Sequence, residues 1–124
     1  MHEPRPLVIF GASRGVGLEL ARLESAAGRR VIALVRPQSD AAALVETGAT
    51  VLRGDALAKV DVTRILAGID AAFEIASTLG GTAPDGRRAD DEGNINVIDA
   101  ALASGRVQRF LLITSIGCGE MAPF

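Results

Sequence analysis

Three glycines stand at a spacing that suits the binding of a phosphate group. Gly11, Gly15 and Gly17 follow the short apolar run 7–10, which favours a buried β-strand. Gly11 lets the chain leave this strand in a tight turn, Gly15 lets backbone approach a pyrophosphate, and Gly17 lets a helix pack closely on the strand. A helix beginning here offers unpaired N–H groups and a partial positive charge to an anion. The stretch predicts a dinucleotide-binding turn; the alternative is a flexible loop.

Two arginines favour a dinucleotide that carries an additional phosphate. Arg36 stands nineteen residues after Gly17, close to the place where NAD-selective sites carry an acid for the ribose hydroxyl groups. A guanidinium there attracts a 2′-phosphate, which a carboxylate would repel. Arg14, inside the glycine loop, can reach the same phosphate, and the nearest acid to Arg36 is Asp40. We predict NADP(H) in preference to NAD(H); the alternative is that both arginines are ordinary solvated charges.

The elements that must position these residues alternate along the chain. Strands are expected at 7–10, 31–35, 50–53, 71–76 and 110–115, and helices at about 16–27, 39–45, 60–66 and 90–104. Glu74 makes the fourth strand the least convincing, and residues 77–88 form one long loop. Such alternation gives parallel strands with helices on both faces. We predict a single α/β domain over residues 1–124, a doubly wound parallel sheet of about five strands.

Composition argues against several classes of function. The 124 residues include 13 basic and 15 acidic side chains and no basic run, which argues against nucleic acid or an anionic membrane surface as the main partner. One cysteine and one histidine exclude an intrachain disulfide and a metal site built from nitrogen and sulfur ligands. No apolar run reaches the ~18 residues of a transmembrane helix, and residues 1–6 do not resemble a signal peptide. We expect a cytoplasmic protein.

The stretch 10–17 resembles the coenzyme loop of short-chain dehydrogenases/reductases. The chain from 6 to 119 is similar to the atypical branch of that superfamily, the NmrA-like and biliverdin-reductase-B-like NAD(P)H-binding proteins. The supporting stretches are Val35-Arg36-Pro37, Arg53-Gly54-Asp55 and 109–115. This resemblance implies a Rossmann fold, with the dinucleotide on the glycine loop. Besides its glycines and Arg14, that loop contributes Ser13 and Val16.

The resemblance also implies two further parts of the coenzyme site. Asp55 would accept a hydrogen bond from the adenine amino group, with Ala56 beside it. The backbone of Ala76, Ser77 and Thr78 would lie beside the ribose on the nicotinamide side. The alternatives are that Asp55 caps the turn after the third strand, and that 76–78 is a turn rich in Ser and Thr.

The resemblance leaves the chemistry open. Ser115 stands where the superfamily's catalytic serine would be, but the Tyr-x-x-x-Lys motif is missing, because the chain has no tyrosine and its one lysine is Lys59. Carbonyl reduction needs a proton donor as well as a hydride, and Ser115 alone is a poor donor. Members of the family without this tyrosine either reduce flavins, quinones or tetrapyrroles with a solvent proton, or bind NADP(H) without turnover as redox-sensing regulators. Both functions are compatible with the sequence; a flavodoxin-like nucleotide-binding domain fits the loop spacing less well.

The last residues carry three further expectations. Cys118 follows the fifth strand, where it is either a reactive thiol or a small buried residue. Relatives build their substrate wall beyond residue 124, so we expect a fragment, a shortened form, or half of a site that a second subunit completes. Sheet surface left uncovered would favour a homo-oligomer.

Overall fold

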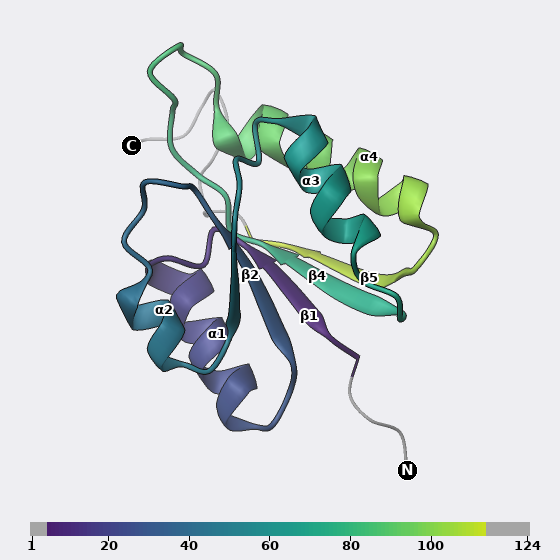
Figure 1. Ribbon diagram of the computed structural model, residues 1–124. Coiled ribbons are helices and arrows are strands. Elements are labelled where there is room, and N and C mark those ends of the chain that lie inside the picture. Colours follow the sequence, from purple (N-terminus) through teal and green to yellow (C-terminus); the bar gives the residue numbers. More distant parts are fainter. Residues whose placement is uncertain (1–4, 114–124) are drawn as a thin grey trace.

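Five parallel strands form one sheet in the order β3-β2-β1-β4-β5 (Figure 1). The computed structural model describes residues 5–113. The strands are β1 (Leu7–Phe10), β2 (Val31–Val35), β3 (Thr50–Arg53), β4 (Phe73–Ser77) and β5 (Val107–Leu112). The helices are α1 (Gly15–Ala26), α2 (Ala42–Glu46), α3 (Lys59–Ala67) and α4 (Asn94–Ser104), the last preceded by the π-helical turn η1 (Ala89–Gly93). The predicted doubly wound α/β fold is confirmed.

The strand order reverses beside β1. The chain winds outward from β1 to β2 and β3, then crosses back to place β4 on the other side of β1. Phe10 at the end of β1 is therefore in register with Leu34 of β2 on one side and with Ser77 of β4 on the other. In open α/β sheets, ligands bind outside the carboxyl ends of the strands at such a reversal. The glycine loop begins at this point.

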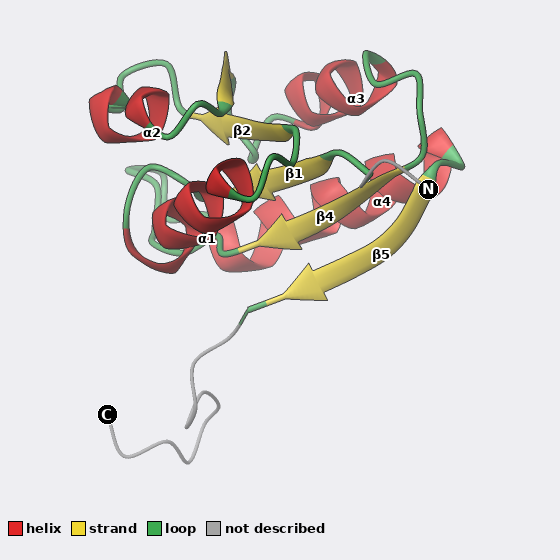
Figure 2. Cartoon of the chain, turned by 90° about the horizontal axis from the view of Figure 1, so that it is seen from below, coloured by secondary structure: helices red, strands yellow, loops and turns green. Residues whose placement is uncertain are grey.

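Helices cover both faces of the sheet, so its central strands are buried on both sides. Helices α1 and α2 lie on one face, and α3 and α4 lie on the other (Figure 2). Val8 and Phe10 pack into the cluster under α3 and α4, whereas Leu7 and Ile9 pack into the cluster under α1 and α2. This double burial is the reason that β1 is a continuous apolar run without alternation.

Several element boundaries differ from those predicted. Strand β4 runs from Phe73 to Ser77 rather than over 71–76, β5 begins three residues before the expected position, and α4 begins only at Asn94. The early start of β5 was missed because Gln108 and Arg109 interrupt its apolar pattern. The structure tolerates them because β5 is an edge strand whose side chains are mostly exposed. Burial imposes a strict apolar pattern only on the inner strands.

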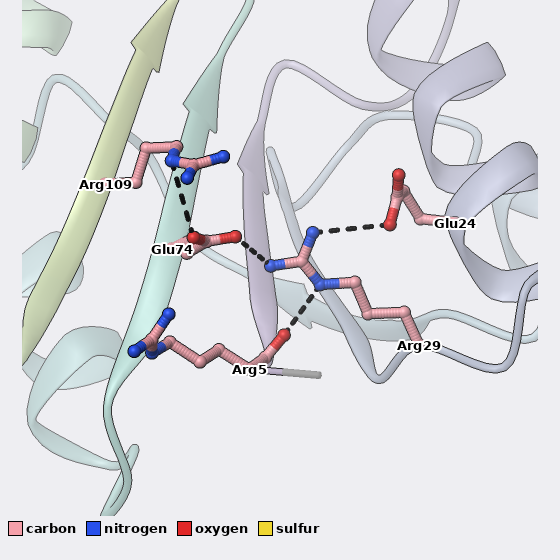
Figure 3. A network of polar contacts seen from close by, with 5 residues as sticks. All are labelled: Arg5, Glu24, Arg29, Glu74 and Arg109. Atoms are coloured by element: carbon pink, nitrogen blue, oxygen red, sulfur yellow. Dashed lines mark hydrogen bonds and ion pairs between the residues drawn. The ribbon is translucent and has the colours of Figure 1, made fainter. Parts of the chain in front are cut away.

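Glu74 stays in β4 because basic side chains surround its carboxylate (Figure 3). Arg29 pairs with Glu74, lies 3.3 Å from a carboxylate oxygen of Glu24, and donates from Nε to the carbonyl of Arg5 at 2.6 Å. Arg109 on β5 approaches the second oxygen of Glu74 at 3.7 Å. Both Glu74 and Arg29 are largely buried, so each needs the other to compensate the loss of hydration.

We expect Glu74→Gln to lower the free energy of unfolding by about 1–2 kcal/mol, because it leaves the largely buried Arg29 charge with weaker partners. Arg109→Gln is the matched control, since Arg109 is 77% exposed and its contact with Glu74 is long. It should change stability by less than about 0.5 kcal/mol. Urea unfolding of both variants measures the difference. Equal stability of Glu74→Gln and Arg109→Gln would contradict this account of the network.

Candidate functional site

The turn between β1 and α1 is fastened to the end of β4. Gly11 has φ +86°, and a Cβ there would lie 2.7 Å from the hydroxyl oxygen of Thr78. The Thr78 hydroxyl donates to the carbonyl of Gly11 at 2.7 Å, and the Thr78 N–H donates to the carbonyl of Phe10 at 2.8 Å. Thr78 therefore supports the glycine loop directly. Only a residue without a Cβ fits this turn.

Gly17 lets α1 approach the same turn. A Cβ on Gly17 would lie 2.7 Å from the Thr78 hydroxyl and closer still to the carbonyl oxygen of Gly11. The backbone atoms on the opposite side cannot move without dismantling the turn. The close packing predicted for Gly17 is present in the structure.

The third glycine faces open space. Gly15 has φ +62°, and no described atom lies within 4 Å of a Cβ built on it. It is the first residue of α1, next to the exposed side chains of Arg14 and Val16. Within residues 5–113, no side chain caps the first N–H groups of this helix. The amino end of α1 is thus open to an anion.

Beside this helix end is a hollow of about 350 Å³ that brings the two predicted arginines together. It is lined by Ser13, Arg14, Arg36, Ser39, Asp40 and Ala43. Arg14 comes from the glycine loop, and Arg36 follows β2 directly. The Asp40 carboxylate accepts a hydrogen bond at 2.9 Å from the N–H of Ala42, at the start of α2. One oxygen of the Asp40 carboxylate is therefore engaged with the backbone at the start of α2.

Arg36 begins a turn over residues 36–39, and a side chain at the end of β3 stabilises this turn. The N–H of Ser39 donates to the carbonyl of Arg36 at 3.0 Å, with Pro37 at the second position that such turns favour. One guanidinium nitrogen of Arg53, at the end of β3, donates to the carbonyls of Arg36 at 3.0 Å and of Ser39 at 2.6 Å. Sequence reasoning assigned no role to this side chain, because nothing local connects residue 53 with residues 36–39.

Asp55 is fixed at the end of β3 by several hydrogen bonds. Its own carboxylate accepts at 2.9 Å from the N–H of Leu57, which is the turn-capping role considered above. Asp61 on α3 accepts from the N–H of Asp55 at 2.9 Å, and Asn96 on α4 donates to the carbonyl of Ala56 at 2.8 Å. These hydrogen bonds fix residues 55–57 relative to α3 and α4. Within the described residues, only one carboxylate oxygen of Asp55 accepts a hydrogen bond.

At the end of β4, the side chain of Ser77 is hydrogen-bonded within the protein. Ala76 and Ser77 are buried, and the Ser77 hydroxyl donates to the side-chain oxygen of Asn94. The Asn94 amide in turn donates to the carbonyl of Asp90 at 2.8 Å. The Ser77 hydroxyl is thus committed to the start of α4, and the Ser77 carbonyl accepts from the N–H of Ile113 at 3.0 Å. Asn94 was missed; a polar residue within an apolar helical pattern was the available signal.

The predicted loop 77–88 folds back on itself. Thr82 and Arg88 form an antiparallel bridge, and the N–H of Ala83 donates to the carbonyl of Arg87 at 2.8 Å. The Arg87 N–H beside the Asp85 carboxylate holds the pKa of Asp85 below its usual value. Paired local charges stabilise the loop as a hairpin-like arm.

The remaining candidates are Ser115 and Cys118, and both lie outside the described residues. Within residues 5–113, no helix is long and apolar enough to cross a membrane. The same part of the chain contains no group of three or more His, Cys, Asp or Glu side chains arranged around a metal position.

The residues present fit a phosphorylated dinucleotide. The amino end of α1 is uncapped and open at Gly15, as a pyrophosphate requires. The arginines of the adjacent hollow suit a second anionic group, and the whole arrangement lies where the strand order reverses.

Comparison with known proteins supports a dinucleotide site. The anaerobilin reductase ChuY of Escherichia coli O157:H7 is 34% identical, with a TM-score of 0.76 over 95% of this chain and 54% of ChuY. The Photosystem II assembly factor Ycf39 of Synechocystis is 26% identical over 114 residues, which is 92% of this chain and 35% of Ycf39. Leucoanthocyanidin reductase from Vitis vinifera, solved with NADPH, is 23% identical with a TM-score of 0.68 over 85% of this chain and 34% of its own, and shares the fold.

The chain thus spans about half the length of ChuY and about a third of the length of Ycf39. Its resemblance to atypical NAD(P)H-binding reductases is confirmed by these relatives and by a family match over nearly the whole sequence. Residues 11–124 match the family described as NAD(P)H-binding, and the chain belongs to that family.

Proposed function

We propose that this chain binds NADP(H) in preference to NAD(H) and forms the coenzyme-binding part of a reductase for a conjugated small acceptor. The observation that carries the coenzyme preference is the hollow beside α1, which Arg14 and Arg36 both line. Guanidinium groups form charge-assisted hydrogen bonds to phosphate, whereas a ribose hydroxyl gains little from two cations. The acid in the hollow, Asp40, already accepts a hydrogen bond from the N–H of Ala42.

Each part of the site has a defined role in this proposal. The amino end of α1, with Ser13, Gly15 and Val16 around it, holds the pyrophosphate, and Arg36 together with Arg14 holds the 2′-phosphate. Asp55 accepts from the adenine amino group beside Ala56, and the backbone of 76–78 supports the second ribose. The coenzyme supplies a hydride when it is bound. The residues of this chain orient the nicotinamide ring and leave one face of that ring accessible to the acceptor.

The acceptor class is supported by the relatives. Residues 1–124 contain no tyrosine, so within this part of the protein the available proton sources are solvent and a weaker donor such as Ser115. Electron-poor conjugated acceptors such as flavins, quinones or tetrapyrroles tolerate this, because hydride transfer to them needs mainly face-to-face placement. Similarity to an anaerobilin reductase supports this class.

A non-catalytic role is the second candidate. The similarity to a protein named as an assembly factor supports an NADP(H)-binding regulatory module. Leu111 and Leu112 on the edge strand β5 are 51% and 47% exposed, which supports association with a second copy in either case. We expect both forms of the function to operate in the cytoplasm.

Titration with NADPH and NADH tests the proposal, followed by the fluorescence of the reduced coenzyme. The chain contains no tryptophan or tyrosine, so protein emission hardly interferes. We expect NADPH to bind at least about tenfold more tightly than NADH, a difference of about 1.4 kcal/mol. Equal affinities would refute the preference, and absence of binding would refute the site.

A second assay separates the two candidate functions. The saturated protein is mixed with a flavin or a quinone, and the loss of reduced nicotinamide absorbance is followed. Steady oxidation of NADPH above the rate without protein supports a reductase. Tight binding without turnover supports the regulatory module.

A further inference from the structure

We propose that Arg53 is a positioning residue that sets the preference of this site for NADP(H). The inference rests on the proposed function and extends it to a side chain outside the hollow. Arg53 does not line the hollow; its guanidinium reaches from the edge strand β3 to the backbone of the turn that carries Arg36.

The turn depends on this contact because little else packs against it. Arg36, Pro37 and Gln38 are exposed, and Ser39 is half-buried. One hydrogen bond closes the turn, from the N–H of Ser39 to the carbonyl of Arg36. Arg53 donates to the carbonyls at both ends of the same turn, so one side chain ties its beginning to its end.

Arg53 is itself well placed to act as a clamp. It pairs in register with Val35, the residue before Arg36, and the N–H of Gly54 donates to the carbonyl of Val35 at 2.9 Å. The base of the Arg53 side chain is therefore fixed relative to the turn by sheet hydrogen bonds. The Arg53 guanidinium then lies within hydrogen-bond distance of the carbonyls of Arg36 and Ser39.

Loss of the Arg53 hydrogen bonds should weaken the binding of NADPH more than the binding of NADH. The glycine-loop wall of the hollow, with Ser13 and Arg14, adjoins a turn that Thr78 fastens without help from Arg53. The opposite wall, with Arg36 and Asp40, belongs to the clamped turn and the residue after it. Charge-assisted hydrogen bonds to phosphate depend on distance and angle, so a loosened wall weakens the 2′-phosphate contact. The pyrophosphate contact at α1 stays intact, and NADH binding with it.

Arg53→Met tests the clamp, with Arg22→Met as the matched control. Arg22 is an exposed arginine of α1 that pairs with Glu19 and does not line the hollow, so its loss removes an equal charge elsewhere. We expect Arg53→Met to weaken NADPH binding about tenfold and NADH binding less than twofold, and Arg22→Met to change neither by more than twofold. Unchanged NADH binding also shows that the variant is folded. Arg53→Lys should recover most of the preference, because an ammonium can donate to both carbonyls.

The Arg22→Met control distinguishes a clamp from a long-range field, because it removes an equal charge from a residue that does not line the hollow. A preference in Arg53→Met within twofold of wild type, or an equal change of preference in Arg22→Met, would overturn the inference while the proposed function stands. A wild-type protein without any preference for NADPH would overturn both.

Discussion

Arg36→Asp is expected to lower the affinity for NADPH about 100-fold and to change the affinity for NADH by less than about threefold. The substitution removes hydrogen bonds between charged groups, worth about 1.5–3 kcal/mol, and places a carboxylate next to a phosphate. A ribose hydroxyl meets no such repulsion and can donate to the new carboxylate. Calorimetric titration of the purified variant with each coenzyme measures the two changes separately.

The structure indicates that Arg36→Asp changes the charge of the hollow without disturbing the turn that carries this residue. The Arg36 side chain is exposed, and it is the carbonyl of Arg36, not its guanidinium, that Arg53 holds. The turn should therefore survive, and the unfolding midpoint should stay close to wild type. Arg22→Asp makes the same charge change on the outer surface of α1 and should affect neither coenzyme strongly. Equal losses of NADPH and NADH affinity in Arg36→Asp would contradict the assignment of Arg36 to the 2′-phosphate.

Gly17→Ala is expected to cost about 3 kcal/mol of stability and to abolish coenzyme binding. The new methyl group would overlap the carbonyl oxygen of Gly11 and lie 2.7 Å from the Thr78 hydroxyl. Relief would require α1 to move away from β1, which would displace the helix end that holds the pyrophosphate. Urea unfolding measures the stability, and coenzyme fluorescence measures the binding.

Gly80→Ala is the control for this substitution. Gly80 has an ordinary φ, and no described atom lies within 4 Å of a Cβ built there. We expect a change within about 0.5 kcal/mol and normal coenzyme binding. If Gly17→Ala were as stable as Gly80→Ala, the packing of α1 against the loop would not need glycine.

Hydrophobic pattern was sufficient for the inner part of the sheet. Strands β1 and β2 lie at the residues predicted, because a strand covered on both faces must be apolar throughout, and Gly or Pro marks its ends. The edge strand β3 also lies where predicted, because Gly48 and Gly54 bound its short run. β4 was placed less well, since the compensation of Glu74 by Arg29 joins residues 45 positions apart. Local pattern contains no information about such a pair.

The candidate site likewise has parts that the local sequence predicts and parts that depend on distant contacts. The sequence by itself determined the glycine turn, because the φ of +86° at Gly11 and the missing Cβ of Gly17 are demands that only particular residue types meet. The tertiary structure alone decided that Arg53 holds the turn of Arg36 and that Ser77 is committed to Asn94. These contacts depend on which strands become neighbours, and strand order follows from the packing of the whole sheet rather than from any short stretch of chain.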